Sequence, residues 1–132
     1  MGRLFTWGVG SHGQLGHGGT GKRLVPTLVG EGAFGGSAVV MAACGAFHTL
    51  VVTQDGALWA CGGGRYGKLG LNDRLGRRRF ERVGARAFDG ARVMAAAAGL
   101  DHSAAVTEDG ALWTWGHGRY ARLGHRSSWR VN

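Results

Sequence analysis

One motif occurs three times in this chain, and each copy begins 54 residues after the last. The segment that starts at Leu4 reads LFTWGVGSHGQLG, and those that start at Leu58 and Leu112 read LWACGGGRYGKLG and LWTWGHGRYARLG. No residue is inserted or deleted between the copies. A constant period of this length is typical of propellers, solenoids and other repeat arrays. The period therefore constrains the fold more than any other feature of the sequence.

The 132 residues hold two complete units and a remainder of 24 residues. We therefore divide the repeat region into a partial blade at 1–37, a full blade at 38–91 and a second partial blade at 92–132. Glycine accounts for 27 residues, far above the usual share of roughly 7%. Because the chain has a single proline and no Gly-X-Y period, this glycine content indicates many tight turns between short strands.

Each unit contains the pattern of a β-hairpin. Apolar runs flank Asp55-Gly56 and, one period later, Asp109-Gly110. An Asp-Gly pair between such runs is a strong hairpin signal. The pair predicts a type I′ turn, in which both central residues have a positive φ angle.

Two further runs extend each hairpin to four strands. The runs 38–44 and 92–98 precede the hairpins, and we predict a strand for the alanine-rich 92–98 because its repeat partner is β-branched at Val39 and Val40. The segments 25–29 and 79–83 would form outer strands, where Pro26 is tolerated at an edge. Four strands per unit are typical of a propeller blade. The predicted fold is all-β, a partial β-propeller of about two and a half four-stranded antiparallel blades with a 54-residue period.

The combined motifs resemble the regulator of chromosome condensation repeat. The resemblance rests on Gly45-Ala46-Phe47-His48-Thr49, on Asp55-Gly56-Ala57-Leu58-Trp59, and on the Gly-x-Gly-x-x-Gly-x-Leu-Gly run that starts at Gly62. It covers nearly the whole chain and implies a seven-bladed β-propeller built from units of this length. It implies much less about activity, because one fold carries many functions.

One branch of this family senses ultraviolet light through tryptophans in a Gly-Trp-Arg-His-Thr motif. The tryptophan position is occupied here by Ala46 and, one period later, by Leu100. The resemblance therefore does not imply light sensing for this chain.

Residues that recur at the repeat period are interpreted as structural. We expect His48 and His102 to be buried polar struts between neighbouring blades rather than general bases or metal ligands, as the family resemblance also implies. Tryptophans recur at two positions of one strand, and alternate residues of a strand face opposite sides, so one set should pack against the next blade. The predicted structural repeat positions are His48, His102, Asp55, Gly56, Asp109, Gly110, Trp59, Trp113, Trp7 and Trp115.

No catalytic, cofactor or metal site is predicted, and the chain is not expected to be an enzyme. Two Gly-x-Gly-x-x-Gly runs lack the following helix that a dinucleotide site needs. The run 16–23 has Arg23 where a phosphate-binding loop carries Ser or Thr. Cys44 and Cys61 lack metal-binding spacing and are interpreted as buried hydrophobic residues in a reducing compartment. No Ser-His-Asp or Cys-His set appears in the sequence.

The chain is basic, with a formal charge of +8. A basic protein is attracted to nucleic acid or to an acidic protein surface, although an arginine-rich coding bias explains the same composition. The arginine cluster includes Arg77, Arg78 and Arg79, which we treat as a candidate surface for an acidic partner. Acidic residues lie among these arginines and few aromatic residues do, so binding to nucleic acid or chromatin is only weakly indicated.

The sequence predicts a non-catalytic repeat module that binds another protein, and a fragment of a larger propeller protein. The loops at 10–23, 64–78 and 118–130 are the expected binding surfaces. Two alternatives stay open: guanine-nucleotide exchange on a small GTPase with chromatin association, and the substrate-binding scaffold of a ubiquitin ligase. The open blade edges also predict self-association. No apolar run is long enough for a membrane helix, and we expect a cytoplasmic or nuclear location.

Overall fold

The structure, a computed structural model, describes residues 2–117 and consists of three antiparallel sheets. The first sheet pairs β1 (Phe5–Gly8) with β2 (Arg23–Leu28). The second joins β3 (Val39–Cys44), β4 (His48–Thr53), β5 (Leu58–Gly62) and β6 (Arg77–Arg82) in that order. The third joins β7 (Val93–Ala98), β8 (His102–Thr107) and β9 (Leu112–Gly116). The 3₁₀ turns η1 (Glu31–Phe34) and η3 (Ala85–Phe88) lie between successive sheets, and η2 (Arg65–Gly67) lies in the loop from β5 to β6.

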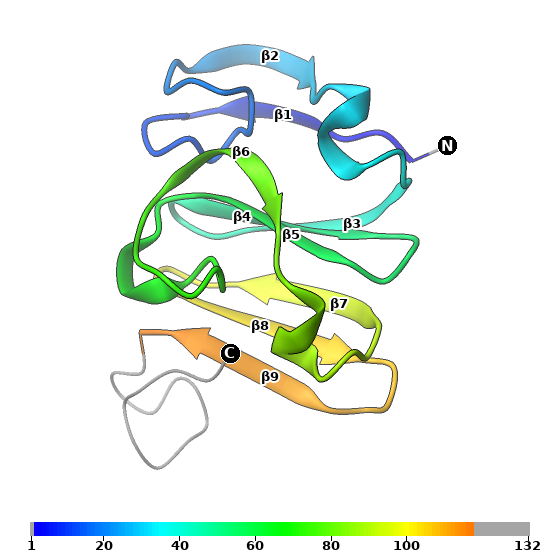
Figure 1. Cartoon of the computed structure of the whole chain (residues 1–132). Helices are drawn as coiled ribbons and strands as arrows, with labels where there is room; N and C mark the ends of the chain where they lie inside the picture. Colours follow the sequence, from blue (N-terminus) through cyan, green and yellow to red (C-terminus); the bar gives the residue numbers. More distant parts are fainter. Residues whose placement is uncertain (1, 118–132) are drawn as a thin grey trace.

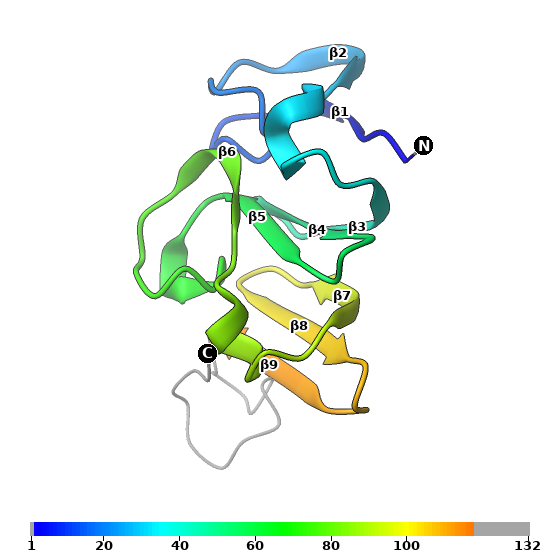
Figure 2. The same ribbon diagram turned by 45° about the vertical axis from the view of Figure 1, so that its right-hand side comes forward.

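The sheets stack face to face in the order of the sequence (Figure 1). The view turned by 45° gives the same order (Figure 2). The loops that join β1 to β2 and β5 to β6 lie on one side of the stack, at the left of Figure 1. Stacked sheets of four antiparallel strands are the architecture of a propeller. The all-β prediction is therefore confirmed, with the middle sheet forming a complete blade.

The predicted strands are present, with small shifts at their ends. The alanine-rich segment is β7, and its pairing with β8 repeats that of β3 with β4. The outer strands β2 and β6 begin two residues earlier than the predicted 25–29 and 79–83. The division at 37/38 and 91/92 stays a prediction, and each sheet lies within one of its three ranges.

The hairpin turns differ from the predicted type I′ geometry. Gly56 has a φ of 83° and Gly110 has the same value, but neither Asp55 nor Asp109 has a positive φ. Gly56 N donates to Thr53 O at 2.9 Å, and Thr53 N donates to Ala57 O at 3.0 Å. A tight turn followed by a left-handed glycine closes the hairpin, which is the usual geometry of a loop one residue longer than type I′.

Two apolar layers hold the three sheets together. Leu50 and Val52 on β4 face the third sheet, where they join a cluster that includes Trp115. Val51, between them in sequence, faces the first sheet in a cluster with Phe80. Successive residues of a strand point to opposite faces, and both faces of β4 are covered, so the strand is buried along its whole length. The middle sheet therefore forms the core of the stack.

The prediction that both cysteines are buried is correct only for Cys61. Cys44 is exposed. It ends β3, where half-buried and exposed residues alternate, and it falls on the exposed side of that alternation.

Candidate interaction surface

One carbonyl oxygen accepts hydrogen bonds across each junction between neighbouring sheets, and it belongs to the same repeat position at both junctions. Gln14 O accepts hydrogen bonds from Thr49 Oγ1 at 2.7 Å and from Cys61 Sγ at 3.4 Å. One period later, Lys68 O accepts from Ser103 Oγ at 2.6 Å and from Trp115 Nε1 at 2.9 Å. The sequence repeat thus produces a repeated joint between sheets.

His48 lies inside the joint between the second and third sheets. Its side chain is fully buried, and its Nε2 lies 3.0 Å from Ser103 Oγ. Since the serine hydroxyl donates to Lys68 O, His48 Nε2 must be the donor to Ser103. Burial, followed by the charge of Lys68, lowers the pKa of His48 to about 4. A buried neutral ring of this kind holds two sheets together and cannot reach a substrate.

A glycine three residues before each recurring histidine makes room for the ring. A Cβ atom at Gly45 would collide with the ring of His48, and one at Gly99 with that of His102. The structure therefore gives both predicted positions the same local setting, although His102 is only partly buried.

The recurring Trp, Thr and Asp residues form one hydrogen-bonded chain in each hairpin. Thr53 Oγ1 donates to Asp55 Oδ1 at 2.6 Å and accepts from Trp59 Nε1 at 3.1 Å. Thr107, Asp109 and Trp113 repeat these bonds at the same distances. The threonine hydroxyl is the main cause of the lowered pKa of each aspartate. Sequence reasoning missed the threonine, although its recurrence at 53 and 107 was a visible signal.

The second tryptophan set is not brought into equivalent settings. Trp115 is 1% exposed and packs on Phe88, whereas Trp7 is 59% exposed. Trp7 occupies the repeat position of Cys61, which is buried on the side of the preceding sheet, and the described residues include no sheet before β1. The prediction that the two tryptophan sets face opposite sides is wrong, because Trp113 and Trp115 both pack in the cluster between the second and third sheets. Residues two apart on a strand share a face.

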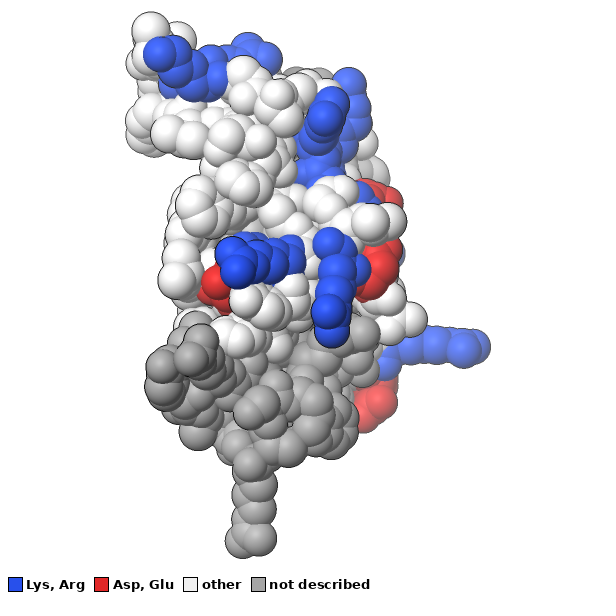
Figure 3. All heavy atoms as spheres, turned by 90° about the vertical axis from the view of Figure 1, so that its left-hand side faces the viewer, with Lys and Arg blue, Asp and Glu red and all other residues white. Residues whose placement is uncertain are grey.

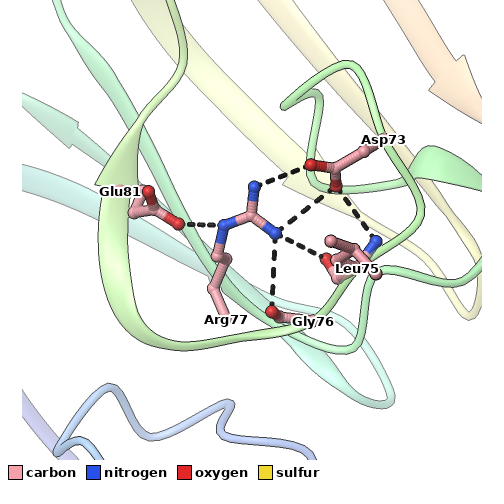
Figure 4. Close-up of polar contacts among 5 residues, drawn as sticks. All are labelled: Asp73, Leu75, Gly76, Arg77 and Glu81. Carbon is pink, nitrogen blue, oxygen red and sulfur yellow. Dashed lines mark hydrogen bonds and ion pairs between the residues drawn. The ribbon is translucent and has the colours of Figure 1, made fainter.

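The three arginines of the predicted acidic-partner surface lie in different environments. The guanidinium of Arg77 binds both carboxylate oxygens of Asp73 and the carbonyls of Leu75 and Gly76, and it pairs with Glu81 (Figure 4). Its charge is thereby neutralised by one carboxylate of the preceding loop and one of β6 itself. The other two members, Arg78 and Arg79, are exposed.

A second ion pair that sequence reasoning missed links the middle and third sheets. Lys68 Nζ lies 2.8 Å from Asp101 Oδ1, and the lysine side chain is only 2% exposed. Burial alone would raise the pKa of Asp101, but the hydrogen bond and charge of Lys68 outweigh it and hold the pKa below its usual value. The signal was available, because the repeat partners Gln14 and Phe47 are both uncharged.

The candidate surface is the side of the stack formed by loops 9–22 and 63–76. Lys and Arg side chains stand out on this side, with fewer Asp and Glu side chains among them (Figure 3). The third predicted binding loop, 118–130, lies outside the described residues. Within residues 2–117, no group of His, Cys, Asp and Glu is arranged to hold a metal ion. In the same range, no helix is long and apolar enough to cross a membrane.

Comparison with known families decides which repeat this is. The profile of the regulator of chromosome condensation (RCC1) repeat matches residues 1–52 and 55–106. A second profile of the same repeat matches residues 40–68 and 95–121. The chain belongs to the RCC1 repeat family. Because the first matched RCC1 unit runs from before β1 to the end of β4, each family unit spans two sheets and connects them covalently.

Several curated proteins contain similar RCC1 repeats. The chain is 44% identical over 124 residues to the ultraviolet-B receptor UVR8 of Arabidopsis thaliana, covering 94% of this chain and 27% of that protein. It is 41% identical over 135 residues to the human E3 ubiquitin-protein ligase HERC2, covering 98% of this chain and 3% of that protein. Mouse protein RCC2 is 35% identical over 129 residues, covering 96% of this chain and 24% of its own length. The chain thus spans about a quarter or less of these relatives.

Solved RCC1-type structures share the fold. The crystal structure of human WBSCR16 superposes with a TM-score of 0.80 at 27% identity, covering 96% of this chain and 33% of that one. Yeast RCC1 (Prp20) bound to Kap60 gives a TM-score of 0.80 at 20% identity, covering 98% of this chain and 31% of that one. These likenesses establish the stacked-blade fold, and this chain spans about a third of the length of each of the two structures.

Proposed function

We propose that this RCC1-type chain is a non-catalytic protein-interaction module that belongs to a larger propeller protein. One observation carries the proposal: recurring residues such as His48 and Thr53 make contacts within or between sheets, while the loops on one side of the stack carry several residues that differ between units. One loop position differs in all three copies, which carry Val9, Gly63 and His117. Ser11 and His12 are replaced one period later by Arg65 and Tyr66, and this Arg-Tyr pair recurs at 119–120. A rigid scaffold that presents variable loops is a common design for binding proteins.

Two recurring residues of types that often serve in catalysis have structural roles here. His48 is buried and neutral, and the Asp55 carboxylate is bound by a threonine hydroxyl. These roles support the view that any enzymatic activity of a parent protein would reside in other domains.

The partner we propose is another protein, in the nucleus or cytoplasm. Protein partners are named for the yeast propellers: one structure contains Kap60, and a further one is described by its binding to Gsp1p and histones. The similarity to HERC2 favours a substrate-binding scaffold of a ubiquitin ligase as the finer role. Binding to chromatin through Arg78 and Arg79 stays a prediction.

Site-specific photo-crosslinking tests the proposed surface. A photoreactive phenylalanine analogue would replace Ser11 or Arg65 on the loop side, and Val40, which is 57% exposed on β3, as the control. Protein adducts in cells are expected from the loop positions and should be absent or different at Val40. Equal adducts at all three positions, or none at the loops, would contradict an interaction surface there.

A nucleotide-release assay tests the alternative of guanine-nucleotide exchange. The chain has no insertion beyond its 54-residue period that could displace a bound nucleotide. We therefore expect no acceleration of fluorescent GDP release from small GTPases. Accelerated release would replace the scaffold proposal with exchange activity.

A further inference from the structure

A hollow of about 450 Å³ opens among the loops that end β1 and β5. Its walls carry His12, Arg65, Tyr66 and Arg74, and its floor is glycine backbone. It draws residues from two successive units, so no single repeat could form it. It lies on the loop side proposed above as the interaction surface.

The floor of the hollow requires glycine. A Cβ atom at Gly64 would overlap the carbonyl oxygen of Leu75, and one at Gly76 would lie 3.0 Å from Gly62 O. Two backbone segments therefore approach so closely that no side chain fits between them. Because glycine has no side chain, these positions contribute no atoms that could fill the hollow, and the surrounding side chains line it.

Tyr66 holds an unusual conformation at the wall of the hollow. Its φ of 61° is in the left-handed region, which costs a residue other than glycine stability and often marks functional positions. Its ring stacks on His117 with centroids 4.0 Å apart, and Arg65 donates to its hydroxyl at 3.1 Å. The ring and its neighbouring guanidinium are thus held in place before any ligand arrives.

The two arginines of the hollow keep their charge available. Within residues 2–117, neither Arg65 nor Arg74 forms a salt bridge, whereas Arg77 forms two. The nearby Asp101 carboxylate is paired with Lys68. The hollow therefore combines two exposed guanidinium groups with an aromatic ring and contains no carboxylate of its own.

We propose that this hollow binds a carboxylate side chain of an acidic protein segment, between Arg65 and Arg74. A guanidinium binds a carboxylate through paired hydrogen bonds in one plane, and the Tyr66 ring can cover the apolar stem of the same side chain. The proposal rests on the interaction function above and names the chemistry of the partner.

A short acidic segment fits this surface better than a nucleic acid. The carboxylates of Asp73, Glu81 and Asp101 lie among the basic residues and divide the positive charge into separate points. A continuous chain of phosphates would meet these carboxylates and be repelled, while one or two carboxylates can bind between them.

Peptide binding to the whole chain tests the proposal. Fluorescence anisotropy would measure a short labelled peptide of alternating Glu and Gly, with a Gln and Gly peptide as the control. We expect the acidic peptide alone to bind. The double variant Arg65→Gln with Arg74→Gln should weaken binding at least about tenfold, because charge-assisted hydrogen bonds are lost. Arg74→Gln alone gives a second reading, since the described residues offer that side chain no bond whose loss could unfold the loop.

The double variant Arg78→Gln with Arg79→Gln is the matched control, because it removes the same charge at exposed positions outside the hollow. Equal weakening by both double variants would mean general charge attraction and overturn the proposal, as would tighter binding of single-stranded DNA of equal charge. The peptide could fail to bind while photo-crosslinking still captures a protein at the loops. That result would contradict the carboxylate-binding site and would leave the proposed interaction function supported.

Discussion

Lys68 illustrates how one residue changes the chemistry of a repeated joint. Its carbonyl oxygen performs the same task as that of Gln14 in the preceding unit. Its ammonium group, however, is nearly buried and bound to Asp101. Removing one partner of a buried ion pair leaves an uncompensated charge. The two residues therefore depend on each other, while the hydrogen-bonded joint beneath them depends on neither side chain.

His48 gives the fold a pH dependence. Its pKa is about 4 in the folded protein and near 6.5 in the unfolded chain, so only the unfolded chain takes up a proton between these values. Stability should therefore be complete above about pH 6.5 and fall by about 3 kcal/mol as the pH drops to about 4. Urea unfolding at several pH values would measure this loss.

The variant His48→Gln isolates this contribution. It keeps a donor for Ser103 but cannot titrate, so the loss of stability in this pH range should largely disappear. His17, whose pKa is lowered by burial and by Arg23, should leave a smaller remainder. His12→Gln, at an exposed ring, is the control. An unchanged slope in His48→Gln would contradict a neutral buried histidine.

At the scale of elements, the hairpins show how one sequence pattern produces both a turn and a contact between sheets. Gly56 O accepts a hydrogen bond from Val93 N at 2.9 Å, and Arg92 donates to the carbonyls of Gln54 and Asp55. The tip of one hairpin therefore receives the first residues of the next sheet. The Asp-Gly pair closes the turn and also prepares this docking point.

Gly56 and Gly110 make a matched pair for mutation. Both have a φ of 83°, so alanine at either position should cost about 1 kcal/mol in backbone strain. At Gly56 the new methyl group would also lie 2.8 Å from Arg92 Cβ, whereas no described atom lies within 4 Å at Gly110. Gly56→Ala should thus cost about 1 to 3 kcal/mol more in denaturant unfolding. Equal losses of stability in the two variants would show that the hairpin tip does not pack against the next sheet.

Much of the fold could be predicted from the period alone, because strands that recur at a fixed spacing must stack on copies of themselves. The turn type could not, since Asp-Gly fits more than one turn and the choice depends on where the flanking strands pair. The ion pairs of Arg77 could not be predicted from the sequence either. Its partners Asp73 and Glu81 are near in sequence, but whether a nearby carboxylate neutralises an arginine depends on the path of the loop.

The candidate site was predicted only as a set of loops. The structure places the loops after β1 and β5 on one side of the stack, and their role in binding stays a prediction. The hollow itself depends on the close approach of two backbone segments at Gly64 and Gly76. The sequence alone does not reveal which backbone segments come into contact.

At the scale of the whole molecule, the stack has two unlike outer faces. Phe5 and Trp7 are exposed on the first sheet, and Val106 and Leu112 on the third. Leu112 occupies the repeat position of Leu58, which is buried against the next sheet. Each outer face therefore exposes apolar side chains of the kind that are buried between neighbouring sheets.

Residues 1–132, expressed alone, should associate through these outer faces, because burying apolar surface is favourable. Trp7 is 59% exposed and Leu112 is 68% exposed. Replacing both by Gln should shift the concentration dependence of light scattering or sedimentation toward the monomer. The control is Leu24→Gln, which removes an apolar side chain that is 83% exposed on the outer strand β2 and should have little effect. A sharp monomer of the unmodified chain at tens of micromolar, or an equal effect of Leu24→Gln, would show that the blade faces do not drive association.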